Sequence, residues 1–148
     1  MQQLKLRKPA VAGQFYSASA NSLRDTIAGL VNKEATKIDA LACMLPHAGY
    51  MYSGRVAALT VSRINLKQKI ILLGPNHTGL GAAFSIMTEG AWQTPLGEVK
   101  IDSSLAGKIK ARSKYLKEDS GAHAYEHSLE VQLPILRYFR TDFEIVPI

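Results

Sequence analysis

The sequence predicts an α/β fold in which a mainly parallel central sheet is flanked by helices. Two observations support this prediction. Short, almost wholly apolar runs such as 40–45 and 69–73 alternate with longer segments whose apolar residues recur at helical spacing, and strands buried on both faces of a parallel sheet have this near-continuous apolar character. The chain has 148 residues, of which 47% are hydrophobic and 20% charged. That size and composition are typical of one globular domain, so we expect residues 1–148 to form a single domain.

The first half of the chain is expected to alternate helix and strand. Apolar residues recur at helical spacing after a possible cap at Asn21 or Ser22, and Ser53 can cap a second helix. An apolar run precedes each of two Pro-His or Pro-Asn-His motifs, which indicates two buried strands. The expected order is helix, strand, helix, strand over residues 21–32, 40–45, 53–64 and 69–73.

The second half is expected to contain a hairpin, two helices and a last strand. Residues 82–87 and 98–102 both have strand character and could pair as the hairpin, followed by a helix from Ser103 or Ser104 to about Leu116. The segment 125–139 also fits a strand, but its length favours a helix kinked near Pro134. Because the chain ends on the strand-like run 143–148, we expect it to be the N-terminal fragment of a longer domain.

Two histidines follow the two predicted strands of the first half. His47 lies in LPHAGYMYSG and His77 in LGPNHTG, each after a proline at the end of an apolar run. Ligands of open parallel sheets bind beyond the carboxyl ends of the strands, and imidazole suits iron, zinc or copper. The two histidines are therefore candidate metal ligands. The alternative is that they are unrelated surface or capping residues.

A third ligand has four candidates in the stretch HAYEHSLE. On a helix, His123 and His127 would share a face, as would His127 and Glu130, and Glu126 and Glu130. The pattern does not choose between them, because carboxylates also favour the first turn of a helix without binding any metal. A histidine has a pKa near neutrality, so His127 could equally act as a general acid or base beside the metal.

Four further residues adjoin the histidines in the sequence and are the expected pocket-lining residues: Tyr50, Tyr52, Asn76 and Glu126. For both tyrosines, a packing role is the alternative. Cys43 lies within the first apolar run and is expected to be a small core residue.

Charge and composition argue against two classes of partner. The net charge is +6, but the basic residues are dispersed, and those near residues 108–117 fit the solvated face of a helix without any nucleic-acid motif. No apolar run approaches the about 20 residues that span a bilayer. A single cysteine cannot form an internal disulfide, which fits a cytoplasmic protein. We expect neither nucleic-acid nor membrane partners.

Several motifs together resemble those of one family. KPAVAGQFY, LPHAGYMYSG, LGPNHTG, WQTPLGEVKID, HAYEHSLEVQLPIL and FEIVPI occur in this order over nearly the whole chain. In these motifs and their order, the sequence is similar to the Memo-like proteins, which include AmmeMemoRadiSam system protein B. The resemblance implies a class III extradiol dioxygenase-like fold, with His47 and His77 as metal ligands and His127 in the same pocket. It also implies a further cysteine ligand from a C-terminal half, beyond Ile148, and Cys43 does not match that position.

The resemblance leaves more than one function open. It implies a non-haem metal-dependent redox enzyme or metal-binding protein, with Fe(II) as the expected metal and Cu or Zn as alternatives. The same pocket could instead serve a non-catalytic module that binds a peptide or a partner protein, and a zinc hydrolase is a third option because two histidines do not specify the metal. Expected partners are a small molecule or peptide ligand and, by resemblance, AMMECR-type and radical-SAM proteins.

Overall fold

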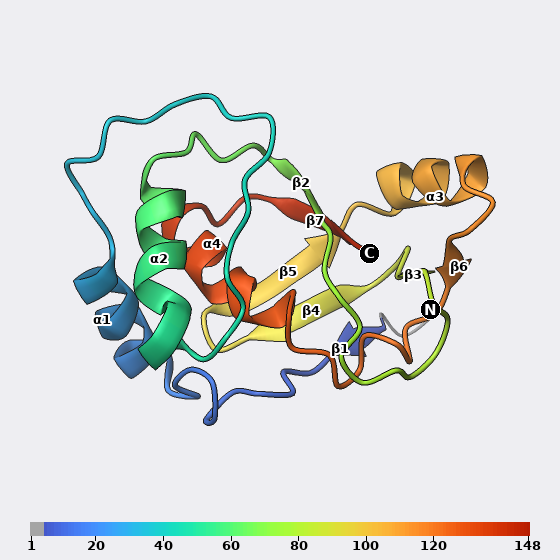
Figure 1. Cartoon of the computed structure of the whole chain (residues 1–148), viewed down its shortest axis with the longest axis horizontal. Coiled ribbons are helices and arrows are strands. Elements are labelled where there is room, and N and C mark those ends of the chain that lie inside the picture. Colours follow the sequence, from blue (N-terminus) through green and yellow to red (C-terminus); the bar gives the residue numbers. More distant parts are fainter. Residues whose placement is uncertain (1–4) are drawn as a thin grey trace.

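The computed structural model describes residues 5–148 and contains a central sheet of five strands (Figure 1). The sheet is mainly parallel, because among its described strands only β4 and β5 pair in antiparallel fashion. A second, two-stranded parallel sheet is formed by β3 (Ser85–Ile86) and β6 (Lys117–Glu118). The α/β class and the mainly parallel sheet are therefore confirmed. In spatial order the central sheet consists of β1 (Leu6–Arg7), β4 (Ala91–Thr94), β5 (Gly97–Ile101), β7 (Glu144–Pro147) and β2 (Lys69–Leu72).

In the described part of the chain, four α-helices accompany the sheet: α1 (Ala20–Leu30), α2 (Tyr50–Ser62), α3 (Ser103–Arg112) and α4 (Leu133–Phe139). Helices α1, α2 and α4 lie together on one side of the view, whereas α3 lies apart from them and contacts β7. The caps differ slightly from those expected, because Ser19 caps α1 and the Asp102 carboxylate caps α3 by accepting from the Leu105 amide at 2.9 Å. No helix within residues 5–148 is long and apolar enough to cross a bilayer.

The core lies between these helices and the sheet. Leu23 and Ile27 of α1, Leu133 of α4, and Trp92 and Ile145 of the sheet are completely buried. Each comes from the apolar side of its element, so the core is built by the periodicity that the sequence shows.

The segment 40–45 is not the buried strand that its apolar sequence predicts. It is irregular, its residues Leu41 and Met44 are almost fully exposed, and Cys43 is exposed as well rather than part of the core. An apolar run becomes a buried strand only when a neighbouring strand pairs with it. Here β2 is the last strand of the sheet on that side, and it does not pair with 40–45.

The hairpin is also different from the expected one. Strand β5 pairs with β4, not with residues 82–87, of which only β3 is a strand. Strand β5 begins directly after the turn with Gly97 at φ +112°, a conformation that glycine adopts readily. The short strand β4, which ends just before Pro95, was not expected from the sequence.

The helix expected over 125–139 begins later. Residues 123–129 form turns, a 3-10 turn covers Glu130–Gln132, and α4 starts at Leu133. Pro134 lies in the first turn of α4, where its missing N–H has no helical partner to lose, so it starts the helix instead of kinking it. The helical faces proposed for residues 123–130 are therefore wrong.

Candidate functional site

His77 is placed by the loop that leaves the carboxyl end of β2. Gly74 continues the pairing with β7 by donating to the Ile148 carbonyl at 3.1 Å. A Cβ at Gly74 would lie 2.6 Å from Leu129 Cδ2 and 2.8 Å from Ser128 Oγ, so the absence of a side chain lets the loop pass close to residues 128–129. The Ser128 hydroxyl also donates to the Pro75 carbonyl at 3.1 Å. These contacts fix the backbone just before His77.

His47 is held by hydrogen bonds to the backbone on both sides of it. The Gln132 amide donates from Nε2 to the Pro46 carbonyl at 2.9 Å, and the Ser53 hydroxyl donates to the Ala48 carbonyl at 2.7 Å. Two residues further on, the Tyr50 amide donates to the Phe15 carbonyl at 2.8 Å. The irregular segment therefore ends at a well-anchored histidine.

Three imidazole rings lie together at this edge of the sheet. The ring centroids of His47 and His77 are 5.1 Å apart, those of His77 and His127 are 4.6 Å apart, and those of His47 and His127 are 6.0 Å apart. Phe15 packs edge-on against His127, at 4.9 Å between centroids. The structure thus brings together the three histidines that the sequence singled out most strongly.

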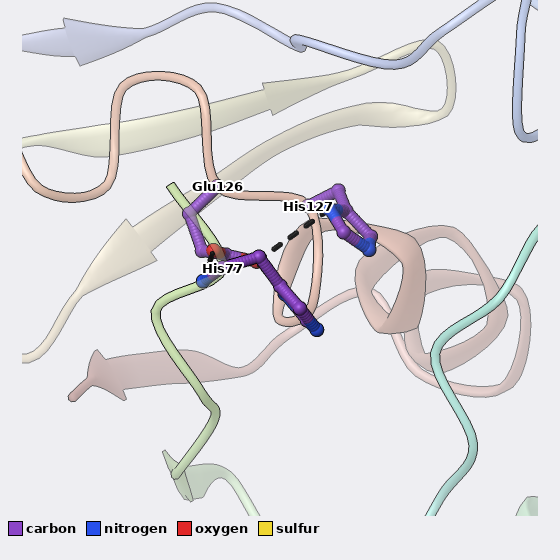
Figure 2. A group of neighbouring side chains, drawn as sticks. All are labelled: His77, Glu126 and His127. Carbon is purple, nitrogen blue, oxygen red and sulfur yellow. Dashed lines mark hydrogen bonds and ion pairs between the residues drawn. The ribbon is translucent and has the colours of Figure 1, made fainter. Parts of the chain in front are cut away.

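Glu126 supplies the negative charge of the cluster (Figure 2). Its carboxylate accepts from the His77 amide at 2.5 Å, from His77 Nδ1 at 2.9 Å and from the Ser128 amide at 2.8 Å. Burial by itself raises the pKa of this carboxyl, but the hydrogen bonds from His77 and Ser128 outweigh it and lower the pKa of Glu126 to about 2. The group is therefore a carboxylate at neutral pH.

The ionised carboxylate also fixes which ring nitrogen of His77 donates. An ionised carboxylate only accepts hydrogen bonds, so Nδ1 of His77 must donate to it. In the neutral ring this leaves the lone pair on Nε2. A carboxylate that orients a histidine in this way is a common arrangement around metal ligands.

His127 is suited to remain neutral. Burial lowers its pKa, and the neighbouring His77 and His47 lower it further, whereas Glu126 acts in the opposite direction from 3.6 Å. A neutral imidazole can bind a metal or accept a proton. Ligand atoms of His77, Glu126 and His127 all lie within 4.8 Å of one another, and such a nitrogen and oxygen donor set suits iron, zinc or copper.

The other two candidates for a third ligand lie elsewhere. His123 is buried against Trp92, with ring centroids 5.6 Å apart, and its carbonyl accepts from Arg7 Nε. Glu130 is completely buried and forms an ion pair with Arg7. The His123 ring packs against Trp92 and the Glu130 carboxylate binds the N-terminal segment, so neither belongs to the group of candidate ligands at His77.

The expected pocket-lining residues are dispersed. Tyr50 is buried and donates to the Val131 carbonyl at 2.8 Å, and Tyr52 is 81% exposed on α2. Asn76 braces its own loop by donating to the Leu80 carbonyl and accepting from the Gly79 amide. Only Glu126 of the four contacts the histidines directly. Phe15, which packs on His127, and Gln132, which binds the Pro46 carbonyl, were not among the predicted site residues. Gln132 stands in an apolar stretch of sequence, which concealed it.

The fold and this cluster define an α/β protein with a histidine–carboxylate cluster beyond the carboxyl end of the parallel strand β2. The family model of the Memo-like proteins matches residues 7–148, and the chain belongs to this family.

Relatives support the same assignment. MEMO1 family proteins of Aquifex aeolicus, Aeropyrum pernix and Ignicoccus hospitalis are 49%, 44% and 44% identical to this chain. The matches cover 98%, 98% and 97% of the chain, but 55%, 57% and 55% of the relatives. The chain therefore spans about half the length of the curated relatives it matches.

Proposed function

We propose that this Memo-like chain provides a non-haem metal site in which His47 and His77 are ligands and His127 handles protons. The observation that supports it is the proximity of three imidazole rings, 4.6 to 6.0 Å apart, beside a carboxylate that is ionised at neutral pH. Fe(II) is the expected metal, with Cu or Zn as alternatives, because each accepts imidazole ligands. A bound iron would supply one-electron redox chemistry and Lewis acidity, as in a metal-dependent oxidoreductase.

Glu126, His127 and Phe15 have separate roles around the proposed metal. Glu126 keeps the proton of His77 on Nδ1, so Nε2 can serve as the ligand atom. His127 stands 4.6 Å from His77, between centroids, and its lowered pKa keeps it ready to accept a proton from a bound substrate. Phe15 covers one side of His127 and limits the access of water to it.

The test is metal binding by single-histidine variants. Purified chain loaded anaerobically with Fe(II) should hold about one ion per chain, measured by elemental analysis and titration calorimetry. His47→Ala and His77→Ala should each weaken binding at least about tenfold, and Glu126→Gln should do so by about 10- to 100-fold because His77 loses its orienting partner. His127→Ala should retain the metal.

His123→Gln provides the matched control, since it changes the one histidine outside the cluster, and circular dichroism should confirm that each variant folds. Unchanged metal content in His47→Ala and His77→Ala would reject the site. If His127→Ala lost the metal as completely as His77→Ala, His127 would be a ligand and its proposed role as a proton carrier would be wrong.

A further inference from the structure

A groove separates the irregular segment 40–45 from strand β2. Its volume is about 510 Å³, and Leu129, Gln132 and Leu136 also line it. The two walls run in the same direction, because Ile38 bridges to Ile64 in parallel fashion at one end. At the other end the rings of His47 and His77 are 5.1 Å apart.

The first wall is the free edge of β2. On its other side, Gln68 and Leu72 accept from β7 through their carbonyls, and Gly74 donates to the Ile148 carbonyl. Backbone groups of successive strand residues point to opposite edges, so those of Lys69, Ile71 and Leu73 face the groove. Within residues 5–148, none of the three has a backbone hydrogen-bond partner.

The second wall is equally unpaired. No backbone group of residues 40–45 takes part in a hydrogen bond within the described chain. The side chains of Leu41 and Met44 are 106% and 93% exposed. Exposed apolar side chains and free backbone groups on one segment are a combination that a folded protein normally covers.

A buried acceptor without a partner lies beside the groove. Gln132 is only 6% exposed, and its Nε2 donates to the Pro46 and Ser128 carbonyls. Its Oε1 has no hydrogen-bond partner among the described residues. An unpaired buried acceptor costs about 1–3 kcal/mol, but this oxygen is closed off from the groove, so the occupant is inferred from the two walls alone.

These features fit one kind of occupant. An apolar small molecule could fill the volume, but it would leave both rows of backbone N–H and C=O groups unpaired. An extended peptide strand satisfies both walls at once and buries the apolar side chains. The relatives contain nearly as much chain outside the matched region as within it, and this unmatched part is a source for such a strand. We propose that a β-strand from that part of Memo-like proteins inserts between residues 40–45 and β2.

The inference is independent of metal binding and can be tested in EDTA. The 148-residue chain is mixed with a polypeptide that comprises the part of the Aquifex aeolicus relative outside the match. Light scattering after gel filtration should show a 1:1 complex. Hydrogen exchange should slow at the amides of Ile71 and Leu73 and within residues 40–45 on binding, because these amides gain partners.

A pair of variants at one position separates the backbone from the side chain. Ile71→Pro removes an N–H that faces the groove and spares the bonds between β2 and β7, and edge strands tolerate proline at such positions. It should weaken the complex at least about tenfold, whereas Ile71→Ala, which keeps the N–H, should weaken it less than about threefold. Circular dichroism should show both variants to be folded.

Three outcomes would overturn the proposal. The first is no complex, and the second is equal affinity of Ile71→Pro and Ile71→Ala. The third is slow exchange of the Ile71 and Leu73 amides in the chain alone. Such protection would mean that the segment 40–45 itself, or a second copy of the chain, already covers the free edge of β2.

Discussion

At the scale of single residues, Glu130 anchors the N-terminal segment to the region of the site. Its carboxylate accepts from Arg7 Nη1, from the Ala10 and Val11 amides and from the Tyr16 hydroxyl. Burial and this hydrogen bond to Glu130 raise the pKa of Tyr16 well above its usual range, so the hydroxyl remains a donor. The same segment contains Phe15, which packs against His127, so Glu130 positions that ring indirectly.

Removing the Glu130 carboxylate should destabilise the protein strongly. Glu130→Ala leaves the buried Arg7 guanidinium without its counter-ion and leaves the Ala10 and Val11 amides and the Tyr16 hydroxyl without this acceptor. The free energy of unfolding should therefore fall by about 3–5 kcal/mol. Urea unfolding followed by circular dichroism measures this change. Glu89→Ala, at an exposed acidic residue, should change it by less than about 0.5 kcal/mol. Similar values for the two variants would contradict a supporting role for Glu130.

His47 and His77 were expected to meet because each follows an apolar run, and their rings do lie side by side. Only the run before His77 is a strand, so this expectation held although half of its reasoning was wrong. Glu130 could not be distinguished from Glu126 in the sequence, because its partner Arg7 lies 123 residues away. The metal-binding roles themselves stay predictions.

At the scale of elements, Gly90 makes the approach of β1 to β4 possible. Its φ of +104° is in the left-handed region, and a Cβ there would lie 2.1 Å from the Lys5 carbonyl oxygen. That carbonyl accepts from the Ala91 amide at the start of β4. A side chain at residue 90 would therefore both strain the backbone and push β1 away from the sheet.

Gly90→Ala should accordingly lower the free energy of unfolding by more than about 2 kcal/mol, since backbone strain of about 1–3 kcal/mol adds to the steric clash. Thermal unfolding measures the effect. Gly107→Ala is the matched control, because a Cβ in α3 would meet nothing within 4 Å, and it should stabilise the protein by about 0.5–1 kcal/mol. Equal melting temperatures for the two variants would show that the close contact at Gly90 does not affect the stability of the fold.

The elements that the sequence predicted best are those whose signal is local. Helices α1, α2 and α3 begin within a few residues of their expected starts because apolar periodicity lies in the helix itself. The expected cap of α2 is wrong, because α2 starts at Tyr50 after Gly49 and Ser53 lies inside it. Residues 40–45 and 123–129 were predicted wrongly because their structure depends on partners distant in the sequence. The segment 40–45 has no strand beside it, and residues 123–129 follow side-chain hydrogen bonds of Arg7 and Glu126.

At the scale of the whole molecule, several carboxyl groups make stability depend on pH. Hydrogen bonds lower the pKa of Asp102, mainly from Lys69, and the pKa of Asp119, mainly from the Ala82 amide. The net effect on Glu126 has the same direction. Because these folded-state pKa values lie below the ordinary values of 3.8 and 4.5, the unfolded chain binds more protons as the pH falls.

The melting temperature should therefore fall gently from pH 7 to about pH 5, because the lowered pKa values of His123 and His127 let the unfolded chain bind protons first. It should fall steeply below the ordinary carboxyl pKa values. The added positive charge works in the same direction, since the chain already has a net charge of +6 at pH 7. Calorimetry at pH 7, 5, 4 and 3 measures the profile. Asp102→Asn should reduce the fall of the melting temperature below pH 5, and Glu89→Gln should leave that fall unchanged. A melting temperature that stays constant down to pH 3 would contradict the lowered pKa values.

The ion pair between Arg7 and Glu130 also constrains when the protein can assemble. The two residues are 123 positions apart, and His77 is separated from Glu126 by 49. Contacts between such distant parts of a chain form slowly and late. On the ribosome, His47 and His77 emerge well before the stretch that carries Glu126, His127 and Glu130. For much of its synthesis the nascent polypeptide thus presents two histidines with neither the carboxylate nor the N-terminal anchor that later surround them.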